Sequence, residues 1–324
     1  MERASLALGS ITSIFDPQNV LRACSELGES PADASLLKTY RKMLTAGPER
    51  FVTKPSNAAC LDTVRAQCPN FSDVLEDLDK YIELSVLGSG SLRFMPILLA
   101  GDPGVGKTHF AKCLAQALGL PYSFISMGTM TAGWTLSGAA STWSGARCGK
   151  VAAALLDDVF ANPLIALDEL DKTGGDSRYD PFGALLQLLE RETAAHFRDE
   201  FIEVPLDTSN LLWVATANDV RNIPGYILSR MAVYEVPAPT REQGRVIAAN
   251  VYAALLREHG YPFAPAMSDD VVDLMAAVSP REMKKKLLDA LGNAARCGRR
   301  ELLCDDVNRS HVAKARSIGF VQQF

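Results

Sequence analysis

The feature that most constrains this chain is a glycine-rich pattern near the end of its first third. Residues 101–108 read Gly-Asp-Pro-Gly-Val-Gly-Lys-Thr and fit the spacing G-x-x-x-x-G-K-[ST]. The apolar run 95–100 precedes the pattern, and a helical pattern over residues 107–118 follows it. A strand, a glycine-rich turn and a helix in this order predict a loop that wraps phosphate groups at the edge of a sheet.

Each residue type in this loop has a chemical reason. Glycines let backbone N–H groups close around phosphate oxygens, where a side chain would block them. The positive end of the following helix dipole faces the anion. Lys107 reaches the β- and γ-phosphates, and the hydroxyl of Thr108 ligates Mg²⁺. The residues expected to contact nucleotide are Gly101, Asp102, Pro103, Gly104, Val105, Gly106, Lys107, Thr108 and His109.

Two acids end the apolar strand predicted for residues 164–167. A buried strand ending in Asp168 and Glu169 suggests that a cation lies at that end. We expect Asp168 to hold the Mg²⁺ shell through water, and Glu169 to polarise the attacking water. The alternative is that both acids cap a helix or face solvent. Their place downstream of the phosphate loop favours the catalytic interpretation.

Asn218 and Arg230 are further candidates. Asn218 ends the apolar strand 211–217, and ligands bind at the carboxyl ends of parallel strands, so we expect it to face the γ-phosphate or the water. An ordinary turn is the alternative. Arg230 precedes the next predicted strand and is a candidate arginine finger for a neighbouring subunit, against the alternative of a surface ion pair.

Arg281 stands in a helix start that reads Ser279-Pro280-Arg281-Glu282. Ser279 and Glu282 predict a capping box with proline at the first position. A cation in the first turn opposes the helix dipole, which favours a functional role. We expect Arg281 to reach the nucleotide from a helical domain. Neutralisation by Glu282 or Asp289 is the alternative.

The order of predicted elements defines the fold class. Short apolar runs alternate with helical patterns over residues 71–239, which predicts a parallel α/β sheet covered on both faces. Residues 240–324 show only helical patterns, opening with a capping box at Thr240 and Gln243. Residues 1–70 read as short helices with a linker at 46–57. We also expect Ser72 and Asp180 to cap helices.

Composition excludes several classes of protein. With 324 residues, 48% of them hydrophobic, the chain can bury a large core in two domains. It has neither a membrane-length apolar run nor a signal peptide, so we expect a cytoplasmic protein. The net charge of −5 argues against nucleic acid as the partner. Seven scattered cysteines without C-x-x-C, and four scattered histidines, predict reduced thiols rather than a zinc site.

These motifs, in this order, resemble an AAA+ ATPase, and more narrowly the ATPase module of Lon proteases. The resemblance spans about residues 71–314. Beyond the phosphate loop it is carried by residues 126–128, 142–145, 149–150, 155–172, 176–190, 201–219 and 223–237. It implies a five-stranded parallel sheet, a helical lid, and a homo-oligomeric, hexameric ring that binds ATP and Mg²⁺ between subunits. It also implies the roles given above for Asp168, Glu169, Asn218, Arg230 and Arg281.

Trp143 falls where that family carries an aromatic residue in a pore loop. The segment 128–150 is rich in glycine, serine and threonine and holds two of the three tryptophans. A large aromatic residue on such a loop grips unfolded polypeptide without reading its sequence. Anchoring the loop to the core is the alternative for both tryptophans, and we prefer it for Trp134.

The resemblance departs from Lon at the ends of the chain. The sequence contains no G-x-S-x-G elbow and leaves no room after the helical domain for a peptidase, so we expect no proteolysis. The leading hypothesis is an ATP-driven remodeller or unfoldase of an unidentified protein substrate. The alternatives are a nucleic-acid motor or loader, and a nucleotide-dependent switch that acts as a scaffold.

Overall fold

The computed structural model describes residues 6–88, 90–130, 133–143, 145–173 and 181–308. The chain divides into two compact units, Met1–Ala238 and Pro239–Phe324. In the parts that the structure describes, no helix has the length and apolar character needed to cross a membrane.

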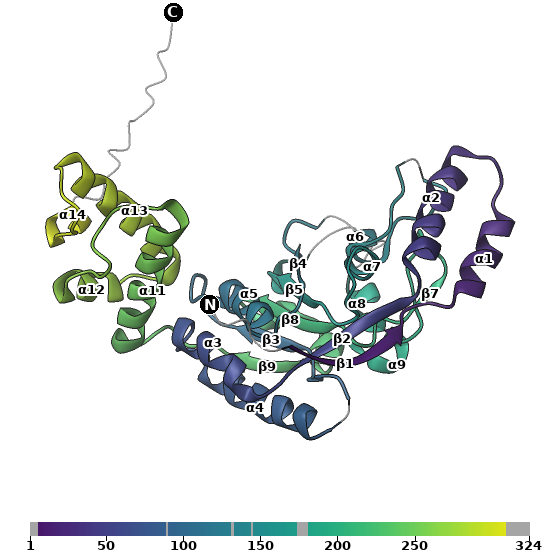
Figure 1. The fold of residues 1–324 in the computed structure, drawn as a ribbon, viewed down its shortest axis with the longest axis horizontal. Coiled ribbons are helices and arrows are strands. Elements are labelled where there is room, and N and C mark those ends of the chain that lie inside the picture. Colours follow the sequence, from purple (N-terminus) through teal and green to yellow (C-terminus); the bar gives the residue numbers. More distant parts are fainter. Residues whose placement is uncertain (1–5, 89, 131–132, 144, 174–180, 309–324) are drawn as a thin grey trace, which may run out of the picture. The chain divides into compact units, whose positions relative to one another are not determined.

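A five-stranded parallel sheet forms the centre of the first unit (Figure 1). Its strand order is β4-β5-β8-β3-β9, which places the strand before the glycine-rich loop between two others. The strands are β3 (Ile97–Ala100), β4 (Tyr122–Ser126), β5 (Leu164–Asp168), β8 (Leu212–Ala217) and β9 (Ala232–Glu235). The sheet expected from the sequence is therefore confirmed.

Alternate residues of these strands enter two separate cores. Ile97, Leu99 and Val214 pack with helices α3, α4 and α5 on one face. Leu98 and Trp213 pack with α6, α7 and α8 on the other. This period of two is what a sheet buried on both faces requires. The helices are α3 (Asp62–Gln67), α4 (Ser72–Leu87), α5 (Lys107–Ala117), α6 (Trp134–Ser137), α7 (Lys150–Leu156) and α8 (Pro181–Leu189).

The N-terminal segment differs from its prediction. The expected helices are present, but a two-stranded antiparallel ribbon flanks them, and one of its strands occupies the expected linker 46–57. The elements are β1 (Leu6–Ser13), α1 (Pro17–Glu26), α2 (Pro31–Ala46), β2 (Glu49–Pro55) and the short helix η1 (Ala58–Leu61). In β2, exposed Glu49 and Phe51 alternate with buried Arg50 and Val52, a strand period that the flanking prolines obscured. Figure 1 shows α1 and α2 at one end of the ribbon.

Backbone and side-chain hydrogen bonds fix the ribbon to the rest of the first unit. Phe51 bridges to Phe160, with its N–H donating to Val159 O and its carbonyl accepting from Ala161 N–H. The side chain of buried Asn162 donates to Thr53 O at 2.7 Å and accepts from Thr53 N–H at 3.2 Å. A satisfied buried amide of this kind specifies one docking position.

The remaining elements of the first unit are short. They are η2 (Leu170–Lys172), α9 (Arg191–Ala194), β6 (Phe197–Arg198), β7 (Pro205–Leu206), η4 (Val220–Asn222) and α10 (Gly225–Leu228). Ser72 is the first residue of α4, whose N-cap is Phe71, so the predicted cap at Ser72 is wrong. The predicted cap at Asp180 lies outside the described residues.

The second unit is helical throughout its described residues. Its helices are α11 (Arg241–His259), α12 (Asp269–Ala276), α13 (Pro280–Arg296) and α14 (Cys304–Asn308). The capping box of Thr240 and Gln243 is present as predicted. At α13 the expected box is not formed, because the Ser279 hydroxyl bonds the Glu282 carboxylate at 3.3 Å and caps no backbone N–H.

Candidate active site

The glycine-rich loop leaves the carboxyl end of β3 and enters α5. Gly101, Gly104 and Gly106 all have positive φ, between 87° and 155°. At Gly101 a Cβ atom would lie 2.4 Å from the carbonyl oxygen of Val236. No other residue type fits there without moving the neighbouring strand, so the loop conformation depends on glycine.

Lys107 lies at the centre of the site. It is only 7% exposed, and its Nζ donates to Gly101 O at 2.6 Å, Asp102 O at 2.9 Å and Asn218 Oδ1 at 3.1 Å. Burial lowers the pKa of Lys107, while the carboxylates of Asp171, Asp168 and Asp102 oppose that shift. The structure thus brings the predicted lysine and the predicted asparagine into direct contact.

Asp168 accepts two hydroxyl hydrogen bonds on one oxygen. Thr108 Oγ1 donates to Asp168 Oδ1 at 2.6 Å, and Thr216 Oγ1 donates to the same atom at 2.8 Å. Thr216 Oγ1 also accepts from the backbone N–H of Glu169 at 3.0 Å. Thr216, on β8, was not predicted as a site residue. Its signal was a hydroxyl within an otherwise apolar strand.

Glu169 has a left-handed backbone, with φ of 58° and ψ of 50°. Its carboxylate forms an ion pair with Lys172. A Cβ atom on Gly128, two residues after β4, would lie 2.6 Å from Glu169 Oε2. Glycine at 128 therefore leaves room for the Glu169 carboxylate, and an αL backbone at a non-glycine residue is a feature that concentrates at active sites.

The donor set beside the loop suits Mg²⁺. A hydroxyl and a carboxylate, Thr108 and Asp168, are hard oxygen donors 2.6 Å apart at the carboxyl edge of the sheet. They adjoin a loop whose backbone N–H groups and lysine suit phosphate oxygens. These residues fit a Mg²⁺–nucleotide complex. His109 follows Thr108, but its side chain contacts Cys113 and not the glycine loop.

Arg230 lies at the opposite edge of the sheet. It lies two residues before Ala232, the first residue of β9, which pairs with Ile97 at the start of β3. Within the chain its Nε forms an ion pair with Glu190 Oε1 at 2.6 Å. The phosphate loop follows the other end of β3, a strand that spans about 13 Å at 3.3 Å per residue. Arg230 is thus not brought together with the other predicted site residues.

Arg281 occupies the first turn of α13 in the second unit and is exposed. Among the described residues, no acidic side chain pairs with it. The alternative, neutralisation by Glu282 or Asp289, is therefore not seen, and Glu282 instead contacts Ser279.

The segment that holds Trp143 is braced by a buried carboxylate. Asp199 is 0% exposed and accepts from the backbone N–H groups of Gly149, Phe201 and Ile202. Burial raises the pKa of Asp199 to about 6, although these three hydrogen bonds oppose the rise. Trp143 is 47% exposed. Its backbone N–H donates to Ala140 O and closes a turn. Trp134 begins α6 and is partly buried.

Some cysteines and histidines that are far apart in the sequence lie close together in the fold. None of the seven cysteines forms a disulfide. Cys68, His109 and Cys113 nevertheless meet beside α5, with their sulfur and nitrogen atoms all within 4.8 Å of one another.

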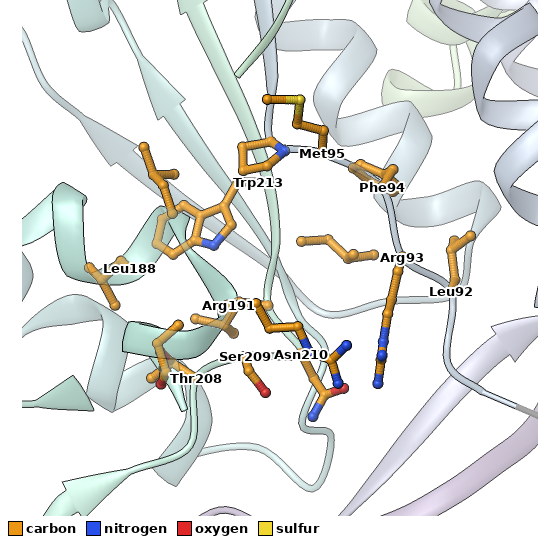
Figure 2. Close-up of a pocket in the computed structure, with 15 residues that line it drawn as sticks. Leu92, Arg93, Phe94, Met95, Leu188, Arg191, Thr208, Ser209, Asn210 and Trp213 are labelled. Atoms are coloured by element: carbon orange, nitrogen blue, oxygen red, sulfur yellow. Dashed lines mark hydrogen bonds between the residues drawn. The ribbon is translucent and has the colours of Figure 1, made fainter. Parts of the chain in front are cut away.

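A cavity of about 220 Å³ opens at the amino edge of the sheet. Figure 2 shows Trp213 and Leu188 on one side of it and the segment from Leu92 to Met95 on the other. Because these residues lie at the starts of β3 and β8, the cavity is at the opposite end of the strands from the phosphate loop. It is not the nucleotide site.

Comparison with known families decides what this arrangement is. Residues 97–237 match the ATPase family associated with various cellular activities (AAA). This range runs from β3 to the residue after Val236 and contains the phosphate loop, Asp168, Glu169, Asn218 and Arg230. The chain carries an AAA-family ATPase module. The chemistry of such a module is ATP hydrolysis.

Lon proteases are among the relatives of this AAA module. The chain is 33% identical over 253 residues to the Lon protease of Heliobacterium modesticaldum, covering 75% of this chain and 30% of that protein. It is 31% identical over 297 residues to that of Geobacter metallireducens, covering 88% and 35%. It is 41% identical over 153 residues to Lon protease 2 of Bdellovibrio bacteriovorus, covering 47% and 19%. The chain thus spans about a third or less of these relatives. The predicted resemblance to the Lon ATPase module is confirmed.

Solved structures show the same fold for the AAA module. The branch migration motor RuvB of Thermotoga maritima superposes with a TM-score of 0.52 at 16% identity, over 73% of this chain and 67% of that one. A mutant of the same motor gives the same score over 73% and 68%. At this identity the likeness concerns architecture alone.

Proposed function

We propose that the chain couples ATP hydrolysis in a homo-oligomeric ring, a hexamer, to the remodelling or unfolding of a protein substrate. Two observations support the proposal. The ATPase module is similar to that of Lon proteases, and Trp143 is exposed on a loop that buried Asp199 braces. The convergence of Lys107, Asp168 and Asn218 on one loop supports the ATPase chemistry that the ring would use.

Within the site, each side chain has one task. Lys107, released from its carbonyl partners, neutralises charge on the β- and γ-phosphates. Thr108 and Asp168 would hold Mg²⁺, which when bound shields phosphate charge and orients the nucleotide. Glu169, freed from Lys172, accepts the proton of the attacking water, and Asn218 orients that water or the γ-phosphate.

Arg230 would serve the site of a neighbouring subunit. Its position at the amino edge of the sheet, a strand length from its own phosphate loop, favours action in trans. The ion pair with Glu190 then has a positioning role, because it holds the guanidinium at this edge until a neighbouring nucleotide competes for it. Exposed Arg281 would likewise reach the nucleotide from the helical second unit, the lid.

Trp143 would contact the substrate directly. An indole ring presents a large rigid surface that packs against any unfolded chain. The bracing by Asp199 at Gly149 supports a loop whose base is fixed while its tip stays accessible. A protein substrate is favoured over nucleic acid, since the net charge is −5. Seven cysteines without a disulfide support a reducing compartment such as the cytoplasm.

Replacing Trp143 tests the proposal. The assay follows loss of fluorescence from a green fluorescent protein with an unstructured tail, together with phosphate release. Trp143→Ala should abolish ATP-dependent unfolding and keep most of the ATPase activity, whereas Trp143→Phe should retain unfolding. Val159→Ala, a change at another exposed apolar residue, is the control. Unfolding by Trp143→Ala at the wild-type rate would refute the role of the loop, and wild-type protein that hydrolyses ATP without unfolding would refute the remodelling function.

A further inference from the structure

Two cysteines and a histidine form a cluster beside α5, the helix that follows the phosphate loop. Cys68 is 3% exposed and Cys113 is 5% exposed, while His109 is accessible to solvent. Their three ligand atoms lie within 4.8 Å of one another. His109 Nε2 is 3.3 Å from Cys113 Sγ, and Gln67 Oε1 is 3.1 Å from the same sulfur.

The local fold places these groups together. His109 and Cys113 are four residues apart on α5 and therefore share one face of the helix. Cys68 is the C-cap of α3, fixed by its N–H bond to Val64 O. Two rigid elements far apart in sequence thus supply the ligands, and the cluster does not depend on a flexible loop.

We propose that Cys68, His109 and Cys113 bind a zinc ion. Two thiolates and an imidazole are the ligands that zinc prefers, and tetrahedral bonds of about 2.0–2.3 Å require donor atoms roughly 3.3–3.8 Å apart. The His109 and Cys113 atoms are already at this spacing, at 3.3 Å, and no pair among the three ligand atoms is more than 4.8 Å apart. The fourth position falls to Gln67 Oε1 or to water. Exposed His109 provides the path of entry.

The position of the site gives the ion a consequence for the nucleotide. Thr108, the expected Mg²⁺ ligand, immediately precedes His109. The segment after Cys68 already supports the loop, since Asn70 Nδ2 donates to Val105 O at 3.2 Å and the Phe71 ring stacks on Phe110 at 4.4 Å. A zinc ion joining α3 to α5 would fix the start of α5 against this support. The ion is distinct from the magnesium that hydrolysis uses.

Cobalt titration of the full chain under a non-thiol reductant tests the site. Co²⁺ bound by thiolate gives an intense ultraviolet charge-transfer band, and bound by oxygen ligands it does not. We expect a band that saturates at one Co²⁺ per chain and disappears when Zn²⁺ is added. His109→Ala and Cys113→Ser should weaken Co²⁺ binding by about 100-fold, given that loss of even an outer partner costs roughly 10–100-fold.

Two control variants separate this site from the rest of the chain. Cys297→Ser removes an exposed thiol, and Asp168→Asn removes the carboxylate of the magnesium site, so both should keep the band. His109 is exposed, so His109→Ala is expected to fold even if a buried cysteine change does not. Absence of the band, or its persistence in both His109→Ala and Cys113→Ser, would overturn the site. Finding a Cys68–Cys113 disulfide in the reduced protein, without bound metal, would also overturn the site.

Discussion

Thr216 connects the two acids at the end of β5. Its hydroxyl donates to Asp168 and accepts from the backbone of Glu169, so one side chain links the proposed metal ligand to the proposed base. Through these two hydrogen bonds Thr216 acts by positioning. The hydroxyl is the only polar atom in the Thr216 side chain, so an isosteric change isolates its effect.

Thr216→Val should lower kcat by about tenfold and leave the KM for ATP nearly unchanged. Loss of a hydrogen bond that leaves a partner unsatisfied costs about 1–3 kcal/mol, and 1.4 kcal/mol corresponds to tenfold. Steady-state phosphate release measures both constants. Thr216→Ser, which keeps the hydroxyl, is the control and should remain close to wild type. A rise in KM alone would mean that Thr216 supports nucleotide binding rather than hydrolysis.

Asp199 predicts a pH dependence of stability. Its folded pKa, about 6, lies above its usual value because of burial, so its favourable contribution is complete below the unfolded pKa and is lost as pH rises through about 6. Between about pH 7 and pH 5 the wild type should gain about 1 kcal/mol of stability relative to Asp199→Asn, which does not titrate. Urea unfolding followed by tryptophan fluorescence measures this, because all three tryptophans lie in the first unit. A constant difference across this range would contradict the assignment.

At the scale of elements, the segment joining α3 to α4 supports the phosphate loop. Asn70 is buried and donates to the carbonyls of Val105 and Pro237, linking the loop to the segment that follows β9. Phe71 stacks on Phe110, one turn into α5. The loop is therefore held from outside the glycine-rich motif, by residues that no motif marked.

Asn70→Ala should destabilise the first unit by about 1–3 kcal/mol, because two buried carbonyls lose their donor. ATP affinity should fall with it, since the carbonyl of Val105 belongs to the loop. Fluorescent-nucleotide titration and urea unfolding measure the two effects. Ser72→Ala removes a neighbouring exposed hydroxyl and should change neither. A stability loss without a change in affinity would show that the loop keeps its shape without this support.

The same scale shows what sequence alone could predict. The central strands were identifiable because their apolar runs are bounded by glycine, proline or charged residues, and the loop motif identified Lys107 and Thr108. Strand β2 was missed because prolines and charges masked an alternation of only seven residues. Thr216 and the Cys68–His109–Cys113 cluster depend on strand register and helix packing, which bring distant residues together without any local pattern.

At the scale of the whole molecule, the proposed ring needs groups from both ends of the parallel strands. The phosphate loop lies at the carboxyl edge, and Arg230 with Glu190 lies near the amino edge. A single chain cannot bring these together across the sheet, whereas a ring that places one edge of each subunit against the other edge of the next can. Assembly and hydrolysis should therefore depend on each other.

Light scattering with Mg-ATP tests that dependence. Glu169→Gln should bind ATP, lose hydrolysis by about 10²–10⁴-fold and form stable particles near six times the 35.0 kDa chain mass. Arg230→Ala should bind ATP and lose hydrolysis on the order of 10³-fold. Glu190→Gln breaks the ion pair but keeps the guanidinium, so it should retain most of the activity if Arg230 acts in trans. If Arg230→Ala and Glu190→Gln lose the same amount of ATP hydrolysis, Arg230 acts only through its ion pair within the chain. A chain that stays monomeric with ATP would refute the ring.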